Sequence, residues 1–145
     1  MNPVRAGDIM TTRVVTIDEH ATLAYAAHLL GPDPESALHV VDASGRLVGI
    51  VTATHLLDRI RALLNTIDLA STGWDSVSDT MTSPVLAVGA DTDITHIVAA
   101  LTDRDARTCT VPVVDGFTPI GAVTRLDLVR ALSEGTPPPP PKRSA

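Results

Sequence analysis

Apolar residues in the first half of the chain follow two spacings, one typical of strands and one typical of helices. Residues 14–17 form a short β-branched run. From Leu23 onward the apolar positions recur at i, i+3, i+4 and i+7, which predicts a helix over residues 23–30. Gly31 and Pro32 follow and end that helix.

A hairpin and a second helix are predicted next. Residues 38–42 and 46–52 are strand-like runs on either side of the turn Ala43-Ser44-Gly45. The helix after them carries its apolar residues on one face, at Leu56, Leu57, Ile60, Leu63 and Leu64.

The same order of elements recurs in the second half. The lead-in Asp8-Ile9-Met10-Thr11 returns as Asp79-Thr80-Met81-Thr82. A strand at 85–88, a helical stripe from Ile94 to Leu101, a hairpin over 111–124 and a final helix follow it. The final helix begins in Gly121-Ala122-Val123-Thr124-Arg125-Leu126-Asp127-Leu128, which matches Gly49-Ile50-Val51-Thr52-Ala53-Thr54-His55-Leu56.

The spacing between equivalent residues indicates an internal duplication. Met10 and Met81 lie 71 residues apart, as do Leu30 and Leu101. The separation is 73 for Asp42 and Asp115 and 72 for Gly49 and Gly121, so the length changes fall in loops. We therefore expect one repeat over residues 4–64, a linker over 65–78 and a second repeat over 79–133. Residues 134–145 contain a polyproline run at 137–141 and are expected to be a disordered tail.

Composition fits two small halves that share buried surface. The chain has 145 residues, of which 44% are hydrophobic and 2% aromatic, so Val, Leu, Ile and Ala must form the core. A lone half of roughly 60 residues would be marginally stable, which favours packing one half against the other.

Charge and cysteine content exclude several classes of partner. The net charge is −6 and the 11 basic residues are scattered, so nucleic acid is not an expected partner. The sequence has neither a membrane-length apolar run nor the pattern of a signal peptide. The single cysteine, Cys109, cannot form an intrachain disulfide. These features predict a cytoplasmic protein with no membrane association.

No catalytic or metal-binding motif is present, so we do not expect an enzyme. The five histidines show no close ligand spacing. The carboxylates Asp91 and Asp93 stand where a helix start accounts for them.

In their order, these duplicated motifs resemble tandem CBS domains, which pair as a Bateman module. The resemblance covers residues 4–133 and implies an α+β fold. Each repeat would be a three-stranded sheet with two helices, and the repeats would pack as an intramolecular pseudo-twofold pair. It also implies ligand clefts between the halves, homodimers and an effector protein. An adenosine derivative is the implied ligand and no cofactor is required.

The segment Thr124-Arg125-Leu126-Asp127 has two compatible interpretations. By spacing, Thr124 and Asp127 form a capping box at the start of a helix. By resemblance, Asp127 accepts hydrogen bonds from both hydroxyls of a ribose, with Thr124 beside it.

The first copy departs from the family pattern, because His55 stands in place of the aspartate. A neutral imidazole offers one donor and one acceptor, so it cannot accept both ribose hydroxyls. The pocket at Thr52 and His55 is therefore expected to be empty, degenerate or selective for something else.

Further site residues follow from the resemblance alone. Family position suggests apolar walls, although core packing explains the same residues: Leu38, Val40, Pro112, Val113 and Ala122. Arg107 and Arg125 are candidate phosphate partners. Cys109-Thr110 and Ser36-Ala37 replace the Arg or His that phosphate-binding members carry, which favours few phosphates or S-adenosylmethionine over ATP.

Two functions remain open at this point. One is a regulatory module that senses AMP, ADP, ATP, S-adenosylmethionine or NAD in the cleft between the repeats. The alternative is a ligand-free protein-interaction or dimerisation module.

Overall fold

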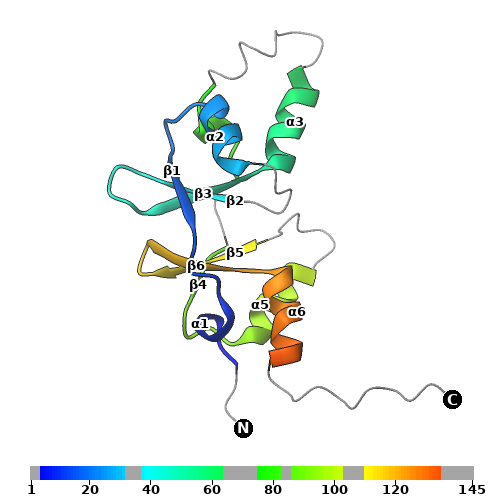
Figure 1. Ribbon diagram of the computed structural model, residues 1–145. Coiled ribbons are helices and arrows are strands. Elements are labelled where there is room, and N and C mark those ends of the chain that lie inside the picture. The colour runs from blue at the N-terminus through cyan, green and yellow to red at the C-terminus, as the bar shows by residue number, and fades with distance from the viewer. Residues whose placement is uncertain (1–3, 32–36, 64–74, 83–85, 103–109, 135–145) are drawn as a thin grey trace, which may run out of the picture.

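The computed structural model describes residues 4–31, 37–63, 75–82, 86–102 and 110–134. Two three-stranded sheets face each other at the centre of the molecule, and the helices lie on the outer sides (Figure 1). Among the described residues, no helix is both long enough and apolar enough to cross a membrane.

The first sheet has the order β1-β2-β3 and belongs to the first half. Strand β2 (Ala37–Val41) pairs in parallel with β1 (Val15–Asp18) and antiparallel with β3 (Leu47–Thr52). Helices α2 (Leu23–Leu30) and α3 (Ala53–Leu63) cover its outer face (Figure 1). The predicted bounds of α2 are confirmed, because its apolar stripe packs on the sheet and Thr22 caps its first turn.

The second sheet repeats this arrangement in the order β4-β5-β6. Strand β5 (Thr110–Asp115) pairs in parallel with β4 (Val88–Gly89) and antiparallel with β6 (Thr118–Thr124). Helices α5 (Ile94–Thr102) and α6 (Arg125–Glu134) complete this half. The predicted fold, two α+β repeats with a three-stranded sheet each, is confirmed.

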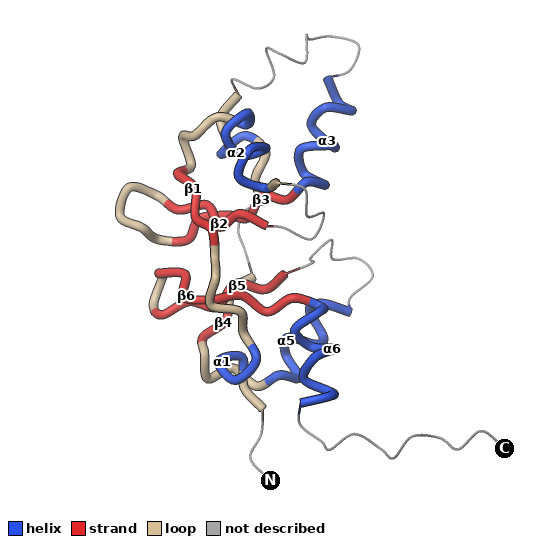
Figure 2. The backbone as a smooth tube through the Cα atoms, in the orientation of Figure 1, coloured by secondary structure: helices blue, strands red, loops and turns tan. Residues whose placement is uncertain are grey.

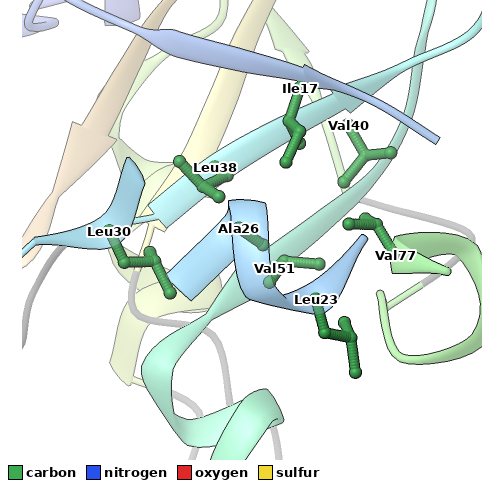
Figure 3. Packing of buried hydrophobic residues seen from close by; sticks show 8 residues of the cluster. All are labelled: Ile17, Leu23, Ala26, Leu30, Leu38, Val40, Val51 and Val77. Carbon is green, nitrogen blue, oxygen red and sulfur yellow. The ribbon is translucent and has the colours of Figure 1, made fainter. Parts of the chain in front are cut away.

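Each half has its own hydrophobic core between its sheet and its helices. Strand β2 directs alternate side chains to opposite faces, so Leu38 and Val40 enter the first core while His39 faces the other sheet. Figure 3 shows this core, in which the buried residues are Ile17, Leu23, Ala26, Leu30, Leu38, Val40, Val51 and Val77. The second core contains Ala6, Ile97, Leu101, Val111, Val113 and Val123.

The lead-in segments are exchanged between the halves. Helix α1 (Ala6–Ile9) lies at the start of the first repeat, yet Ala6 is fully buried in the second core. The short 3₁₀ helix η1 (Val77–Asp79) lies where the second repeat begins. It places Val77, a residue of the predicted linker, in the first core. Figure 2 shows the loop after α1 crossing from one half to the other on its way to β1.

Short backbone pairings fix these crossings next to the sheets. Thr11 forms an antiparallel bridge with Ala122 of β6, with N–O distances of 2.8 and 3.0 Å. Thr82 forms the equivalent bridge with Ile50 of β3, at 3.2 and 2.9 Å. The sequence showed that the lead-ins are repeated but not that each one joins the opposite half.

Candidate functional site

Asp127 caps the last helix and is nearly buried. Helix α6 begins at Arg125, so Thr124 is its N-cap residue and Asp127 is the third helical residue. The Thr124 N–H donates to Asp127 Oδ2 at 2.9 Å, and the Asp127 N–H donates to Thr124 Oγ1 at 3.2 Å. The capping box predicted from the spacing is therefore confirmed.

A threonine from the other end of the chain completes this cluster. Thr11 Oγ1 donates to Asp127 Oδ1 at 2.9 Å, and Thr124 Oγ1 donates to Oδ2 at 3.0 Å. We call Thr11, Thr124 and Asp127 the Asp127 cluster. A carboxylate has about four acceptor positions, so the three donors leave about one position open on a residue that is 7% exposed.

The first half builds the same arrangement around an imidazole. The Thr52 N–H donates to His55 Nδ1 at 3.0 Å, and the His55 N–H lies 3.4 Å from Thr52 Oγ1. His55 Nε2 lies 2.7 Å from Thr82 Oγ1, as Asp127 contacts Thr11 in the second half. We call Thr52, His55 and Thr82 the His55 cluster. His55 thus takes the structural place of Asp127 and keeps the same capping contacts with the N-cap threonine.

Some of the other expected site residues lie near the Asp127 cluster. Ala122 is buried, pairs with Thr11 and lies opposite Pro112 in the sheet. Pro112 is also buried. Arg125 is exposed at the first position of α6. Arg107 and Cys109 lie outside the described residues.

Three of the expected wall residues direct their side chains into the hydrophobic cores. Leu38 and Val40 are buried in the first core and Val113 in the second. Their strands direct these side chains toward the helices, on the face opposite to Ala122, Pro112 and His39. Core packing therefore accounts for these three side chains, and a contact between a ligand and the backbones of their strands stays a prediction.

Thr110 is a candidate that sequence reasoning missed. It lies opposite Thr124 on the same sheet face and is 4% exposed, and its hydroxyl has no hydrogen-bond partner. A buried hydroxyl without a partner is uncommon in proteins and calls for a partner such as a ligand or water. Thr11 was missed as well, although its recurrence as Thr82 in the repeated lead-in was a usable signal.

His39 is a buried polar residue of the first half, at the place that Pro112 takes in the second half. His39 is only 2% exposed, and neither of its ring nitrogens has a partner with good hydrogen-bond geometry. Burial lowers the pKa of His39 from 6.5 to about 4, and the nearby Val15 backbone offsets part of that effect. The imidazole is therefore neutral at pH 7.

Two other features of the described chain do not add to these clusters. An open depression at the hairpin end of the second sheet is lined by residues that include Asp91 and Asp115 but neither Asp127 nor His55. Within the described residues, no three His, Cys, Asp or Glu side chains form a group that could hold a metal ion.

Two curated proteins are similar to this chain over most of its length. An uncharacterized protein of Methanocaldococcus jannaschii is 27% identical over 141 residues, covering 92% of this chain and 33% of that protein. The A-adding tRNA nucleotidyltransferase of Geobacter sulfurreducens is 29% identical over 137 residues, covering 94% of this chain and 14% of that enzyme. The chain spans a third or less of these relatives.

Solved structures share the fold. The CBSX2 structure in complex with AMP aligns with a TM-score of 0.73 at 28% identity, covering 90% of this chain and 96% of that one. The cytosolic domain of the Mg²⁺ channel MgtE in complex with ATP gives 0.67 at 27% identity, covering 88% and 48%. A putative acetoin utilization protein from Vibrio cholerae gives 0.75 at 22% identity, covering 94% and 100%, which is a likeness of fold.

The family model described as "CBS domain" matches this chain twice, over residues 6–62 and 77–134. The two matches correspond to the two halves of the structure, each with its sheet and helices. The chain therefore belongs to the CBS domain family, as two CBS domains in tandem.

Proposed function

We propose that this chain is a regulatory module that senses an adenosine-containing ligand at the Asp127 cluster. The observation that carries the proposal is the hydrogen-bonding state of Asp127. Its carboxylate is held in place by Thr124 and Thr11 and keeps an open acceptor position.

The chemistry of ribose suits such a group. Vicinal hydroxyls are two adjacent donors, and a carboxylate accepts both when its own hydroxyl partners rotate away. The Thr11 and Thr124 hydroxyls are single rotors, so each can give up its bond to Asp127 and bind the ligand. Thr110 adds a buried hydroxyl on the same sheet face.

Related proteins support the ligand class. The CBSX2 structure contains AMP and the MgtE structure contains ATP, and both are more than a quarter identical to this chain where they align. AMP, ADP, ATP, S-adenosylmethionine and NAD are the candidates. Arg125 is the basic residue that we assign to this site, and a single guanidinium favours a ligand with few phosphates.

The output of such a module is a change in association. We expect a homodimer formed through the exposed apolar residues of α3 and α6, and an effector protein that responds to the ligand-bound state. No cofactor and no catalytic step are part of this proposal.

Thermal unfolding against adenosine, AMP, ADP, ATP, S-adenosylmethionine and NAD tests it. A ligand present at a hundred times its Kd should add about 2.7 kcal/mol to the free energy of unfolding, which raises Tm by several degrees. Asp127→Ala should abolish that response.

Asp93→Ala is the matched control. Asp93 caps α5 through bonds to Thr95 at 2.8 and 2.9 Å, so its loss also removes a helix-capping carboxylate, away from the Asp127 cluster. Asp93→Ala should lower Tm by itself but keep the full ligand response. An equal response from wild type and Asp127→Ala would disprove the ribose assignment, and no response to any of these ligands would favour the ligand-free interaction module.

A further inference from the structure

The Asp127 and His55 clusters share their geometry but have opposite hydrogen-bond polarity. In each, a threonine caps a helix, the third helical residue accepts the N–H of that threonine, and a threonine from the crossing segment closes the cluster. The clusters differ in whether the threonine hydroxyls donate their protons to the central side chain or keep them available for a ligand.

In the Asp127 cluster the hydroxyl protons point inward. Thr11 and Thr124 both donate to the carboxylate, which has no proton of its own to give. What remains for a ligand is acceptor capacity, on Asp127 and on the Thr11 oxygen. The cluster therefore favours a group that donates hydrogen bonds.

In the His55 cluster the hydroxyl protons are available. Because His55 Nδ1 accepts the Thr52 N–H, the proton of the neutral ring is on Nε2, which donates to Thr82 Oγ1. The Thr82 oxygen is then an acceptor and its own proton is directed elsewhere. Thr52 Oγ1 likewise accepts the His55 N–H and keeps its proton.

His39 provides a second and independent observation. It lies opposite Ile50 and next to the Ala37–Thr52 pair, so its side chain is on the same sheet face as Thr52. The residue is 2% exposed, and neither ring nitrogen has a partner with good hydrogen-bond geometry, although the Val15 backbone lies close enough to raise the pKa of the ring. A neutral imidazole has one N–H, so it adds a further buried donor on this face. The residue at the equivalent place in the second half is Pro112, which offers no side-chain donor.

We propose that the His55 cluster, together with His39, binds an oxyanion group of a small molecule, a phosphate or a carboxylate, and rejects a ribose diol. The proposal deepens the proposed function, since it gives the module a second site with the opposite preference. The donors would be the Thr52 and Thr82 hydroxyls and the His39 N–H, and none of them requires a positively charged histidine.

The binding test uses the wild-type protein with ¹⁵N-labelled histidine. Inorganic phosphate and acetate are added as probes, and the ring nitrogen signals of His55 and His39 are followed by NMR at pH 7.5. Phosphate, acetate or both should shift these signals in a saturable manner. Thr82→Val should weaken that binding at least about tenfold, the loss typical of a hydrogen bond to a charged group.

Thr54→Val is the control for this substitution. Thr54 is an exposed residue of the first turn of α3, adjacent to His55, and takes no part in the cluster. Phosphate and acetate should bind this variant as they bind the wild type.

Exchange of one side chain tests the polarity directly. His55→Asp keeps an acceptor for the Thr52 N–H, so the helix cap is preserved, but the new carboxylate draws the threonine hydroxyls inward. This variant should lose oxyanion binding. It should also bind adenosine at residue 55, so adenosine should still bind when Asp127→Ala is combined with His55→Asp.

Two results would overturn the proposal. One is the absence of saturable shifts at His55 and His39 with both probes. The other is binding that is unaffected by both Thr82→Val and His55→Asp. Neither result bears on adenosine binding at Asp127, because the thermal-unfolding measurements with adenosine compounds test that binding separately. Failure of one proposal can therefore be told from failure of the other.

Discussion

At the scale of single residues, one helical position supports two kinds of chemistry. Asp127 and His55 both accept the N–H of the preceding N-cap threonine, so both stabilise the start of their helix. They differ in charge and, with the His55 tautomer that we assign, in the direction in which they orient the neighbouring hydroxyls. A substitution that preserves the fold is therefore expected to change what the candidate site binds.

His39 should make the protein less stable in acid. Its folded pKa of about 4 lies below the unfolded value of 6.5, so the unfolded state binds more protons between these values. The stabilisation is complete above pH 6.5 and is lost as the pH falls toward 4, by about 3 kcal/mol in all. Urea unfolding at a series of pH values measures this loss.

A substitution identifies the responsible side chain. His39→Leu should remove most of that pH dependence, because leucine takes the same buried place without a titrating group. His20→Leu controls for the loss of a histidine, since the His20 side chain is 81% exposed. A pH dependence that persists in His39→Leu would show that another group is responsible.

At the scale of elements, each lead-in packs in one half of the molecule, and the chain after it crosses to the sheet of the other half. Met10 and Thr11 lie against β6 at Gly121, and Met81 and Thr82 lie against β3 at Gly49. These crossings also carry the two threonines that close the clusters. The same contacts therefore hold the halves together and complete the candidate sites.

The glycines at these crossings should not tolerate a side chain. A Cβ at Gly121 would come within 2.6 Å of Met10 Sδ and 3.0 Å of the Thr11 carbonyl oxygen, and the latter belongs to the backbone. Gly121→Ala should therefore lower the free energy of unfolding by about 1–3 kcal/mol, as overpacking does. Chemical denaturation of the variant measures the change.

Gly89→Ala provides the comparison within the same sheet. A Cβ at Gly89 would meet nothing within 4 Å, so this variant should stay within about 0.5 kcal/mol of wild type. Equal stability of Gly121→Ala and wild type would mean that the crossing segment can move aside.

At the scale of the whole molecule, an apolar stripe on the last helix remains exposed. Leu126, Val129 and Leu132 are spaced by three residues on α6 and are 56%, 61% and 77% exposed. Leu57 on α3 is 61% exposed, and both helices lie on the outer side of their sheets (Figure 1). Clustered apolar exposure of this kind marks an interaction surface.

We expect this surface to form the homodimer. Val129→Glu should shift the protein toward monomer, because a charge would be buried in the interface without a partner. Sedimentation velocity over a range of protein concentrations measures the association. Phe117→Glu is the control, since Phe117 is 68% exposed in the turn between β5 and β6, outside both helices. A monomeric wild type would refute the expectation.

Much of the fold could be predicted because its signals are local. The stripe at Leu23, Ala26, Ala27 and Leu30 predicts α2 because helical contacts join residues three and four apart. The duplication follows from motifs that recur at nearly constant spacing. The capping box of Thr124 and Asp127 follows from a separation of three residues.

The partners of each site could not be found in this way, because they come from distant parts of the chain. Thr11 reaches Asp127 across 116 residues, and Thr82 reaches His55 across 27. Nothing in a local pattern states that α1 joins the second half or that His39 is buried without a partner. Strand alternation sends the side chains of Leu38, Val40 and Val113 to the cores, which agrees with the core-packing alternative for these residues.

The sequence by itself thus determined the elements, their duplication and the two unequal helix starts, since each depends on residues within one turn or one strand. The tertiary structure decided which threonine closes each cluster and which polar groups are buried between the sheets. These depend on the exchange of lead-in segments, whose free energy comes from burying Ala6 and Val77 in the opposite cores. That exchange turns two similar helix starts into two candidate sites, to which we assign opposite hydrogen-bond polarity.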